Sequence, residues 1–359
     1  MQVLNKFFKL QKVYIFFISI VLFIIFFSTG LLYANNFKVS DVDISSPFEL
    51  DFNKNRVIDE GFRVAYLNLI SMITTSGDRD LLKNISLKEL KGMIDSFTIS
   101  DEKFINNEYF AKLETSFNKE KTLSFLEKKN IFPSMPIKNK VLLVPILVDI
   151  NKDKIYLFTE NIFYQKWNED KKNYYLLEYL LLSEDLEDLN ILQLNSDSIE
   201  NYDFTNLIQK YDLKDYIISI MFKNNDELRV LSKINLKNSL KLDNQKFIKV
   251  DLNNEKNIKK ILESLKTIYE NYWKKNNEIN TSIKLPLTVS INSKEYEKIQ
   301  KLERILTYDD LVFNFHILKF DSINTFYRII YNGSPKNFLS NFTKENIDLE
   351  KTSNVWTVK

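Results

Sequence analysis

The chain has 359 residues, of which 44% are hydrophobic and 27% charged, and its formal net charge is +2. This balance is typical of a folded protein of two or three domains and does not suggest a nucleic-acid surface, so no nucleic-acid partner is expected. The absence of cysteine excludes disulfides, thiolate nucleophiles and cysteine-based metal sites, and the single histidine, His316, excludes motifs that need a histidine pair.

The amino terminus combines lysines with a long apolar segment. Three lysines among the first twelve residues precede the apolar residues 13–32, and small residues lead up to Ala34. This order of basic, apolar and small residues predicts a signal peptide in residues 1–34. A run of about 20 apolar residues is also long enough to span a bilayer, so an inner-membrane anchor stays open. Positive charge before the run keeps the amino end in the cytoplasm, and we therefore expect a periplasmic protein, secreted or anchored to the inner membrane.

Residues 38–131 are predicted to form an amino-terminal α+β domain. Apolar residues recur every three or four positions from Ile58 to Ile73, as on one face of a helix. The other expected elements are strands at 38–45, 97–99 and 109–117, and a helix that Asn118 caps and that buries Leu123 and Leu126. Because the chain has only five glycines, we expect asparagine and aspartate to occupy its turns.

The stretch "MITTSGDRDLLKN" (72–84) follows this helix and combines Gly77 with hydroxyl and charged residues. Phosphate-binding loops lie at the amino ends of helices, whereas a carboxyl end has free carbonyls that repel phosphate. Gly77 stands where a left-handed glycine commonly ends a helix. We therefore predict a helix stop here rather than a binding or catalytic loop, with the next helix beginning near Asp80.

A central α/β domain with a mixed sheet is predicted over residues 138–280, after the proline-containing linker "FPSMP" (132–136). The unbroken apolar run "VLLVPILV" (141–148) suits a strand that is buried on both faces. The other expected elements are strands at 216–222, 227–236 and 246–252, a helix at 205–211, and a long helix with an apolar stripe from Ile258 to Tyr272.

Residues 281–359 follow the order β-α-β-β-α-β, which is the ferredoxin-like plan. The strands are expected at 285–291, 310–320, 323–331 and 354–359. Ser293 is expected to cap a helix that buries Tyr296, Ile299, Leu302 and Leu306, and Ser334 with Pro335 to begin the second helix. The predicted fold class is thus α+β, with three small α/β sandwich-type modules after the signal or anchor segment. A fold of this kind hosts many functions and indicates none by itself.

Several stretches carry a family resemblance. They are "RVAYLNLISMITTSGDRD" (63–80), "NEYFAKLETSFNKEKTLSFLEKKNI" (107–131), "VLLVPILVD" (141–149), "LLLSEDLEDLNIL" (180–192) and "LIQKYDLKDYIISIMF" (207–222). In this order, after a signal peptide, they resemble an exported proteobacterial family, the domain of unknown function 2066. The family implies no catalytic residues. The last stretch is also similar to sensor-like domains of envelope assembly proteins, which implies an accessory or assembly role.

The stretch "DINKDKIYLFTE" (149–160) has the spacing of a calcium loop. Asp149, Asn151, Asp153, the carbonyl of Ile155 and Glu160 fall at positions 1, 3, 5, 7 and 12. Lysine stands at position 6, where such loops need glycine for a sharp turn, and the flanking residues favour strands over helices. A hairpin tip is therefore the preferred interpretation, and calcium is the alternative.

Acidic residues also gather at Glu184, Asp185, Glu187 and Asp188. Helical spacing would place several of these carboxylates on one face, where a pair held in a cleft can do acid–base or glycosidic chemistry. A charged run between apolar segments is more often a solvated helix start. We favour the helix start and keep a carboxylate hydrolase as the alternative.

His316 lies in a predicted strand with no nucleophile assigned to it, so a packed or edge residue is expected. Tyr269, Tyr272 and Trp273 on the long helix suit either an exposed patch for a partner or core packing. No catalytic residue, metal or cofactor is therefore expected. The sequence favours a non-catalytic exported envelope protein that acts through protein contacts, and the alternative is a periplasmic hydrolase, perhaps calcium-dependent.

Overall fold

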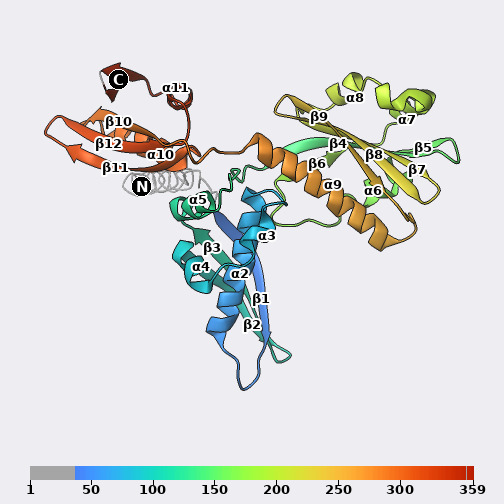
Figure 1. The fold of residues 1–359 in the computed structure, drawn as a ribbon, viewed down its shortest axis with the longest axis horizontal. Helices are drawn as coiled ribbons and strands as arrows, with labels where there is room; N and C mark the ends of the chain where they lie inside the picture. Colours follow the sequence, from blue (N-terminus) through green and yellow to red (C-terminus); the bar gives the residue numbers. More distant parts are fainter. Residues whose placement is uncertain (1–36, 353) are drawn as a thin grey trace, which may run out of the picture. The chain divides into compact units, whose positions relative to one another are not determined.

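The computed structural model describes residues 37–352 and 354–359, so the predicted signal or anchor segment lies outside the described residues. In the described part of the chain, helices pack against three separate β-sheets of three, six and five strands (Figure 1). The predicted α+β class is confirmed.

The first sheet is antiparallel and has the strand order β1-β3-β2. Its strands are β1 (Lys38–Pro47), β2 (Ile94–Ile105) and β3 (Glu108–Phe117), and its helices are α2 (Lys54–Ile73), α3 (Arg79–Leu82), α4 (Leu87–Met93) and α5 (Lys119–Lys128). Alternate residues of β3 are buried, and they form one apolar cluster with the buried side of α2. The predicted cap of α5 is confirmed, because the Asn118 side chain accepts the Lys121 N–H at 2.9 Å.

Helix α2 ends at Ile73, as predicted, but the predicted glycine cap is wrong. No glycine in the described residues has a positive φ, and this includes Gly77. Thr74 follows the helix and is extended with φ −131°, and its N–H and hydroxyl both donate to the Ile70 carbonyl at 2.9 and 2.7 Å. The threonine hydroxyl thus adds a second bond to a carbonyl that its own N–H already satisfies, and the chain leaves the helix without the left-handed residue that a glycine cap needs.

Asparagine and aspartate make the turns, as predicted. Of the twelve described non-glycine residues with positive φ, nine are Asn or Asp. The turn between β2 and β3 is an example, with Asn106 at φ 51° and Asn107 at φ 59°. Two successive left-handed residues give a hairpin turn whose twist matches that of the strands.

The central sheet is mixed, as predicted. Its strands are β4 (Asn139–Asp149), β5 (Lys154–Tyr156), β6 (Leu177–Leu181), β7 (Tyr216–Asn224), β8 (Glu227–Leu236) and β9 (Ser239–Phe247). Strand β4 is parallel to β6 and β7 and antiparallel to β5, and β7, β8 and β9 follow in antiparallel order. The helical segments are η1 (Phe158–Glu160), α6 (Ile162–Lys166), α7 (Leu186–Leu194), η2 (Ser196–Asn201), α8 (Thr205–Gln209) and α9 (Glu255–Asn276).

Strand β4 is buried on both faces, as its sequence predicts. Val141, Leu143 and Leu147 belong to the apolar cluster that contains α9. The alternate residues Leu142 and Val144 belong to a second cluster with residues of α7 and α8. Helices thus cover both faces of this sheet, which explains the unbroken apolar run.

The predicted strand at 246–252 is mostly wrong, since β9 spans Ser239–Phe247. Lys249 has φ 57°, which turns the chain out of the strand, and the Val250 N–H donates to the Asp226 carbonyl at 2.7 Å. The apolar alternation after Phe247 therefore belongs to the loop before α9, where Val250 is buried.

The third sheet has the strand order β11-β12-β10-β14-β13. Its elements are β10 (Leu285–Asn292), α10 (Tyr296–Tyr308), β11 (Val312–Phe320), β12 (Asn324–Tyr331), α11 (Pro335–Lys344), β13 (Leu349–Thr352) and β14 (Val355–Val358). The predicted ferredoxin-like order is confirmed through α11, which begins with the predicted Ser334 cap. An additional strand, β13, precedes the predicted last strand, and β14 lies between β13 and β10.

Two details of α10 differ from the prediction. Glu295, not Ser293, precedes the helix, and the Ser293 hydroxyl lies 3.0 Å from that of Thr325 on β12. Tyr296 is the first residue of the helix and is 73% exposed, whereas Leu302 and Leu306 are buried as predicted. The neighbouring strand therefore engages the serine that sequence spacing assigned to the cap.

Candidate functional site

The predicted calcium loop forms the β4–β5 hairpin. The Asp149 carboxylate accepts the N–H groups of Asn151 and Lys152 at 3.1 and 3.2 Å, as in an ordinary polar turn. Glu160 pairs with Lys154 at 3.0 Å. No group of three or more acidic or histidine side chains suited to a metal ion occurs in the residues that the structure describes. The hairpin interpretation describes this geometry, and calcium binding stays a prediction.

The acidic run at 184–188 starts helix α7. Asp185 caps the helix by accepting the N–H groups of Glu187 and Asp188 at 2.8 and 3.4 Å. Lys210 pairs with Asp185 at 2.9 Å and with the buried Asp188 at 2.7 Å. The hydrogen bond from Lys210 lowers the pKa of Asp185. The hydrogen bonds that Lys210 donates to Asp188 and to Asp185 raise its own pKa. Glu184 and Glu187 are exposed, so the run serves as a cap and an ion pair.

His316 lies exposed on the edge strand β11, and the aromatic residues of α9 considered for a patch are mostly buried. Tyr269 is completely buried, and its hydroxyl contacts those of Ser232 and Ser219 at 2.7 and 3.2 Å. Trp273 is also buried and donates to the Ile137 carbonyl at 2.8 Å. Of the two alternatives left open for these residues, core packing is the one that the structure shows for Tyr269 and Trp273.

Helix α9 contains a buried charged pair that sequence analysis missed. Glu270 and Lys274 are each 1% exposed. One Glu270 oxygen accepts the N–H groups of Leu176 and Leu177 at 2.9 and 2.8 Å, and the other lies 3.9 Å from the Lys274 nitrogen. The available signal was the charged residues at 266, 270 and 274, which recur every four positions along the apolar stripe.

The end of α2 and the stretch after it contact α9 at and beside this pair. Lys274 donates to the Ser71 carbonyl near the end of α2. Asn271 and Ser76 exchange two hydrogen bonds, at 2.9 and 2.7 Å. Ser134 of the predicted linker donates to the Ile73 carbonyl at 2.7 Å. The stretch that suggested a phosphate loop therefore joins the first domain to α9.

Burial sets the protonation of this pair. It lowers the pKa of Lys274 from 10.5 to about 8, although the charge of Glu270 opposes the shift. Burial also raises the pKa of Glu270, against the attraction of Lys274 and Arg79. Such shifts occur in active sites, but both side chains are closed off from solvent, so they cannot reach a substrate. The pair is a structural contact between α2 and α9.

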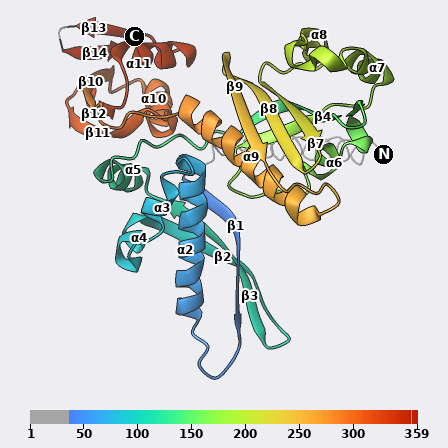
Figure 2. The same cartoon turned by 45° about the vertical axis from the view of Figure 1, so that its right-hand side comes forward.

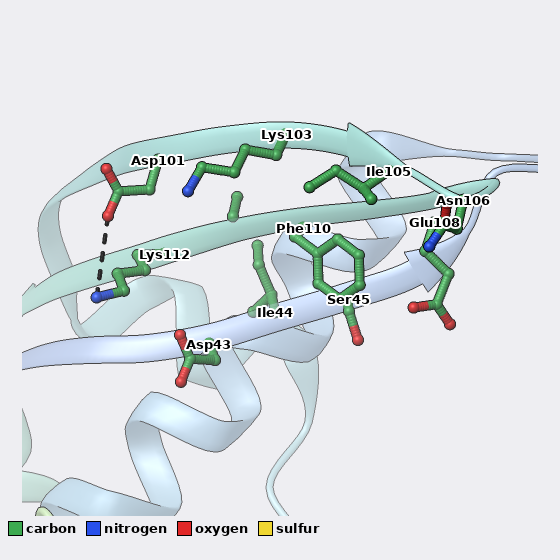
Figure 3. Close-up of a pocket in the computed structure, with 11 residues that line it drawn as sticks. Asp43, Ile44, Ser45, Asp101, Lys103, Ile105, Asn106, Glu108, Phe110 and Lys112 are labelled. Atoms are coloured by element: carbon green, nitrogen blue, oxygen red, sulfur yellow. Dashed lines mark ion pairs between the residues drawn. The ribbon is translucent and has the colours of Figure 1, made fainter.

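The outer face of the first sheet holds a groove of about 720 Å³. Figure 3 shows its side chains along three neighbouring strands, with Phe110 and Ile105 between charged residues. Lys112 lies 3.9 Å from both Asp101 and Asp41, at the outer limit of an ion pair. The groove combines apolar surface with weakly paired charges, a combination common where proteins dock.

Large apolar side chains are exposed at the end of the same sheet. We call Phe48, Leu50, Phe104 and Ile105 the hairpin-end patch. The rings of Phe48 and Phe104 lie 4.9 Å apart in an edge-to-face contact, and Leu50 is fully exposed. Phe104 pairs with the buried Tyr109 on the α2 side of the sheet, whereas the next residue, Ile105, lines the groove on the opposite face. The patch therefore extends around the end of the sheet and adjoins the groove at Ile105.

A second cavity, of about 540 Å³, lies between α6 and α9. Lys166 pairs there with Glu169 and Glu255 at 2.9 and 3.6 Å. The buried Lys266 donates to the Asp170 carbonyl at 3.0 Å, and its burial lowers its pKa. Lys166 is paired with acidic side chains and Lys266 is bonded to a backbone carbonyl, so the cavity does not indicate a class of ligand.

The sequence was also compared with known proteins. No protein-family model and no curated protein matches it. Among the described residues, no helix has the length and apolar character needed to cross a membrane. The family resemblance and the predicted location therefore stay predictions, and the geometry is the basis for a functional proposal.

Proposed function

We propose that the protein is a non-catalytic, exported envelope protein that binds another envelope protein through the hairpin-end patch and the adjoining groove. The observation that carries this proposal is the exposed pair of rings at Phe48 and Phe104, beside the fully exposed Leu50. Water-exposed apolar clusters of this kind are unfavourable in a free protein and typically mark interaction sites. Aromatic side chains are also the commonest anchors of protein interfaces.

The acidic residues support a structural rather than a hydrolytic role. Asp185 and Asp188 are engaged by the α7 backbone and by Lys210, and Asp149 by its own turn. Paired catalytic carboxylates need a cleft in which one is held protonated. Nothing in the described residues favours the hydrolase over the contact function.

Export is supported by the sequence alone. The lysines, the apolar run at 13–32 and the small residues that follow have the order of a signal or anchor segment. The inner membrane is a partner in this proposal if the segment remains uncut. The accessory or assembly role is supported by the similarity of residues 207–222 to sensor-like domains of envelope assembly proteins.

In-cell photocrosslinking tests the contact. A photoreactive phenylalanine analogue at Phe104 is expected to give one discrete adduct with another protein. The matched control is the same analogue at Leu194, an 86% exposed residue on α7, which should give none. Leu50→Ser should reduce the Phe104 adduct several-fold without loss of folding, because this side chain has no packing to lose. No adduct, or the same adducts from both positions, would refute the proposed surface.

A further inference from the structure

Strand β9 differs from the other sheet edges in the described part of the chain. β1, β2 and β11 each have irregular register with their neighbour, and β5, β6 and β13 have five residues or fewer. Strand β9 runs for nine residues in unbroken register with β8 (Figure 2). Bulges and short length protect sheet edges from pairing with other chains, and β9 has neither protection.

The β8–β9 turn fixes which backbone groups of β9 face outward. Lys237 and Asn238 both have positive φ, and Leu236 pairs with Ser239, so this is a two-residue hairpin. The pair that flanks such a turn is hydrogen-bonded, and bonded and non-bonded pairs then alternate. The odd-numbered residues of β9 therefore bond to β8. The N–H and C=O groups of Leu240, Leu242, Asn244 and Lys246 point to the open edge.

The exposed side chains of β9 are complementary to themselves. Leu240 and Leu242 are 63% and 62% exposed. If two copies of β9 pair antiparallel about Leu242, Lys241 of each copy lies opposite Asp243 of the other. Leu242 then meets Leu242, and Leu240 lies diagonal to it.

The backbone pattern agrees with this register. Leu242 is an outward-facing residue, so the central pair can exchange two hydrogen bonds between the copies. The Lys241–Asp243 pairs then become the non-bonded pairs, whose side chains approach most closely. Lys241 already lies over the Tyr272 ring at 5.2 Å, which holds its ammonium group beside the strand. An edge lysine usually disfavours pairing with another chain, but Lys241 would lie opposite the Asp243 carboxylate of a second copy.

We propose that β9 joins two copies of this chain across a twofold axis at Leu242, which makes one continuous sheet of the two central domains. The contact is isologous, since the same strand serves both partners. A nine-residue edge buries little area, so the dimer should depend on protein concentration. This surface is separate from the hairpin-end patch, and each proposal can fail without the other.

Disulfide trapping tests the axis directly. The chain has no cysteine, so Leu242→Cys introduces a single thiol. Oxidation of the purified full-length protein should then link two copies by a disulfide between the introduced thiols, because the Cα atoms of a hydrogen-bonded antiparallel pair lie about 5.5 Å apart. Glu184→Cys, an exposed position just before α7, is the control and should give no disulfide-linked dimer. Equal trapping at both positions would refute the proposed axis.

Charge exchange tests the register. Asp243→Lys should weaken the dimer at least about fivefold in analytical ultracentrifugation, because it places two like-charge pairs across the axis. Lys241→Asp combined with Asp243→Lys should restore it. Leu242→Pro should abolish the dimer and leave the fold intact, since this N–H does not bond to β8. The proposal is overturned if the wild-type protein stays monomeric at high concentration. It is also overturned if Leu242→Cys forms disulfides only with a different protein.

Discussion

At the residue scale, left-handed backbone in the described chain is supplied mainly by asparagine and aspartate, as at Asn106 and Asn107 between β2 and β3. The scarcity of glycine implied that Asn and Asp would adopt left-handed backbone, and most described positive-φ residues are of these types. The cap at Thr74 could not be predicted in this way. A threonine that bonds back to its helix looks, in sequence, like any threonine near a helix end.

The buried Lys274 gives a prediction for stability. Lys274→Met should lower the free energy of unfolding by about 3 kcal/mol at pH 7, because it leaves Glu270 buried without its neighbouring cation. Urea unfolding measures this loss. Lys275→Met, a change at an exposed position in the same turn, is the control and should have little effect.

The same lysine sets a pH dependence. Burial lowers the pKa of Lys274 to about 8 in the folded protein, from the 10.5 of a lysine in water, which applies to the unfolded chain. Between pH 8 and pH 10.5 the unfolded chain therefore binds more protons at this side chain than the folded protein does. Stability of the wild type relative to Lys274→Met should therefore rise from pH 8 to pH 10, by at most about 1.4 kcal/mol per pH unit. A difference that stays flat or falls over this window would show that Lys274 is not desolvated in the folded state.

At the element scale, strands were predicted correctly where burial shaped their sequence. β4 and β7 are apolar runs because helices cover both faces of the sheet. Strand β9 was displaced in the prediction because "SLKLDNQKF" lies at an edge and is largely exposed, so its apolar alternation is limited to Leu240 and Leu242. Strands β6 and β13 have only five and four residues, which is too short for a periodic signal.

The packing of α2 on its sheet depends on a glycine that periodicity does not distinguish. A Cβ at Gly61 would lie 2.7 Å from an Ile44 methyl and 2.8 Å from a Leu113 methyl. Gly61→Val should therefore destabilise the protein by about 1–3 kcal/mol in chemical denaturation, because the helix must move from the sheet. Gly92→Ala on α4 is the control, since its Cβ meets nothing within 4 Å, and it should be neutral or stabilising by up to about 1 kcal/mol. Equal effects of the two changes would show that helix propensity, not packing, determines the result.

At the scale of the whole molecule, the sequence identified the candidate acidic residues as structural, but it did not identify the exposed apolar surface. The acidic runs were identified, and the structure places them in a turn and a helix cap. The hairpin-end patch was missed because Phe48 and Phe104 are far apart in sequence and meet only when β1 and β2 flank β3. Burial of Glu270 and Lys274 was missed for a similar reason, since their partners are distant in sequence. Leu176 and Leu177 contact Glu270, and Ser71 of the first domain contacts Lys274.

Export is the central claim, and thiol labelling in intact cells tests it most directly. The protein has no cysteine, so a small charged maleimide that does not cross the inner membrane reports on one introduced thiol. Glu184→Cys, at an exposed position, should react before cell lysis, and Ser219→Cys, at a fully buried position, should react only after denaturation. If Glu184→Cys reacts only after the inner membrane is broken, the folded domains lie in the cytoplasm and the proposed function is wrong.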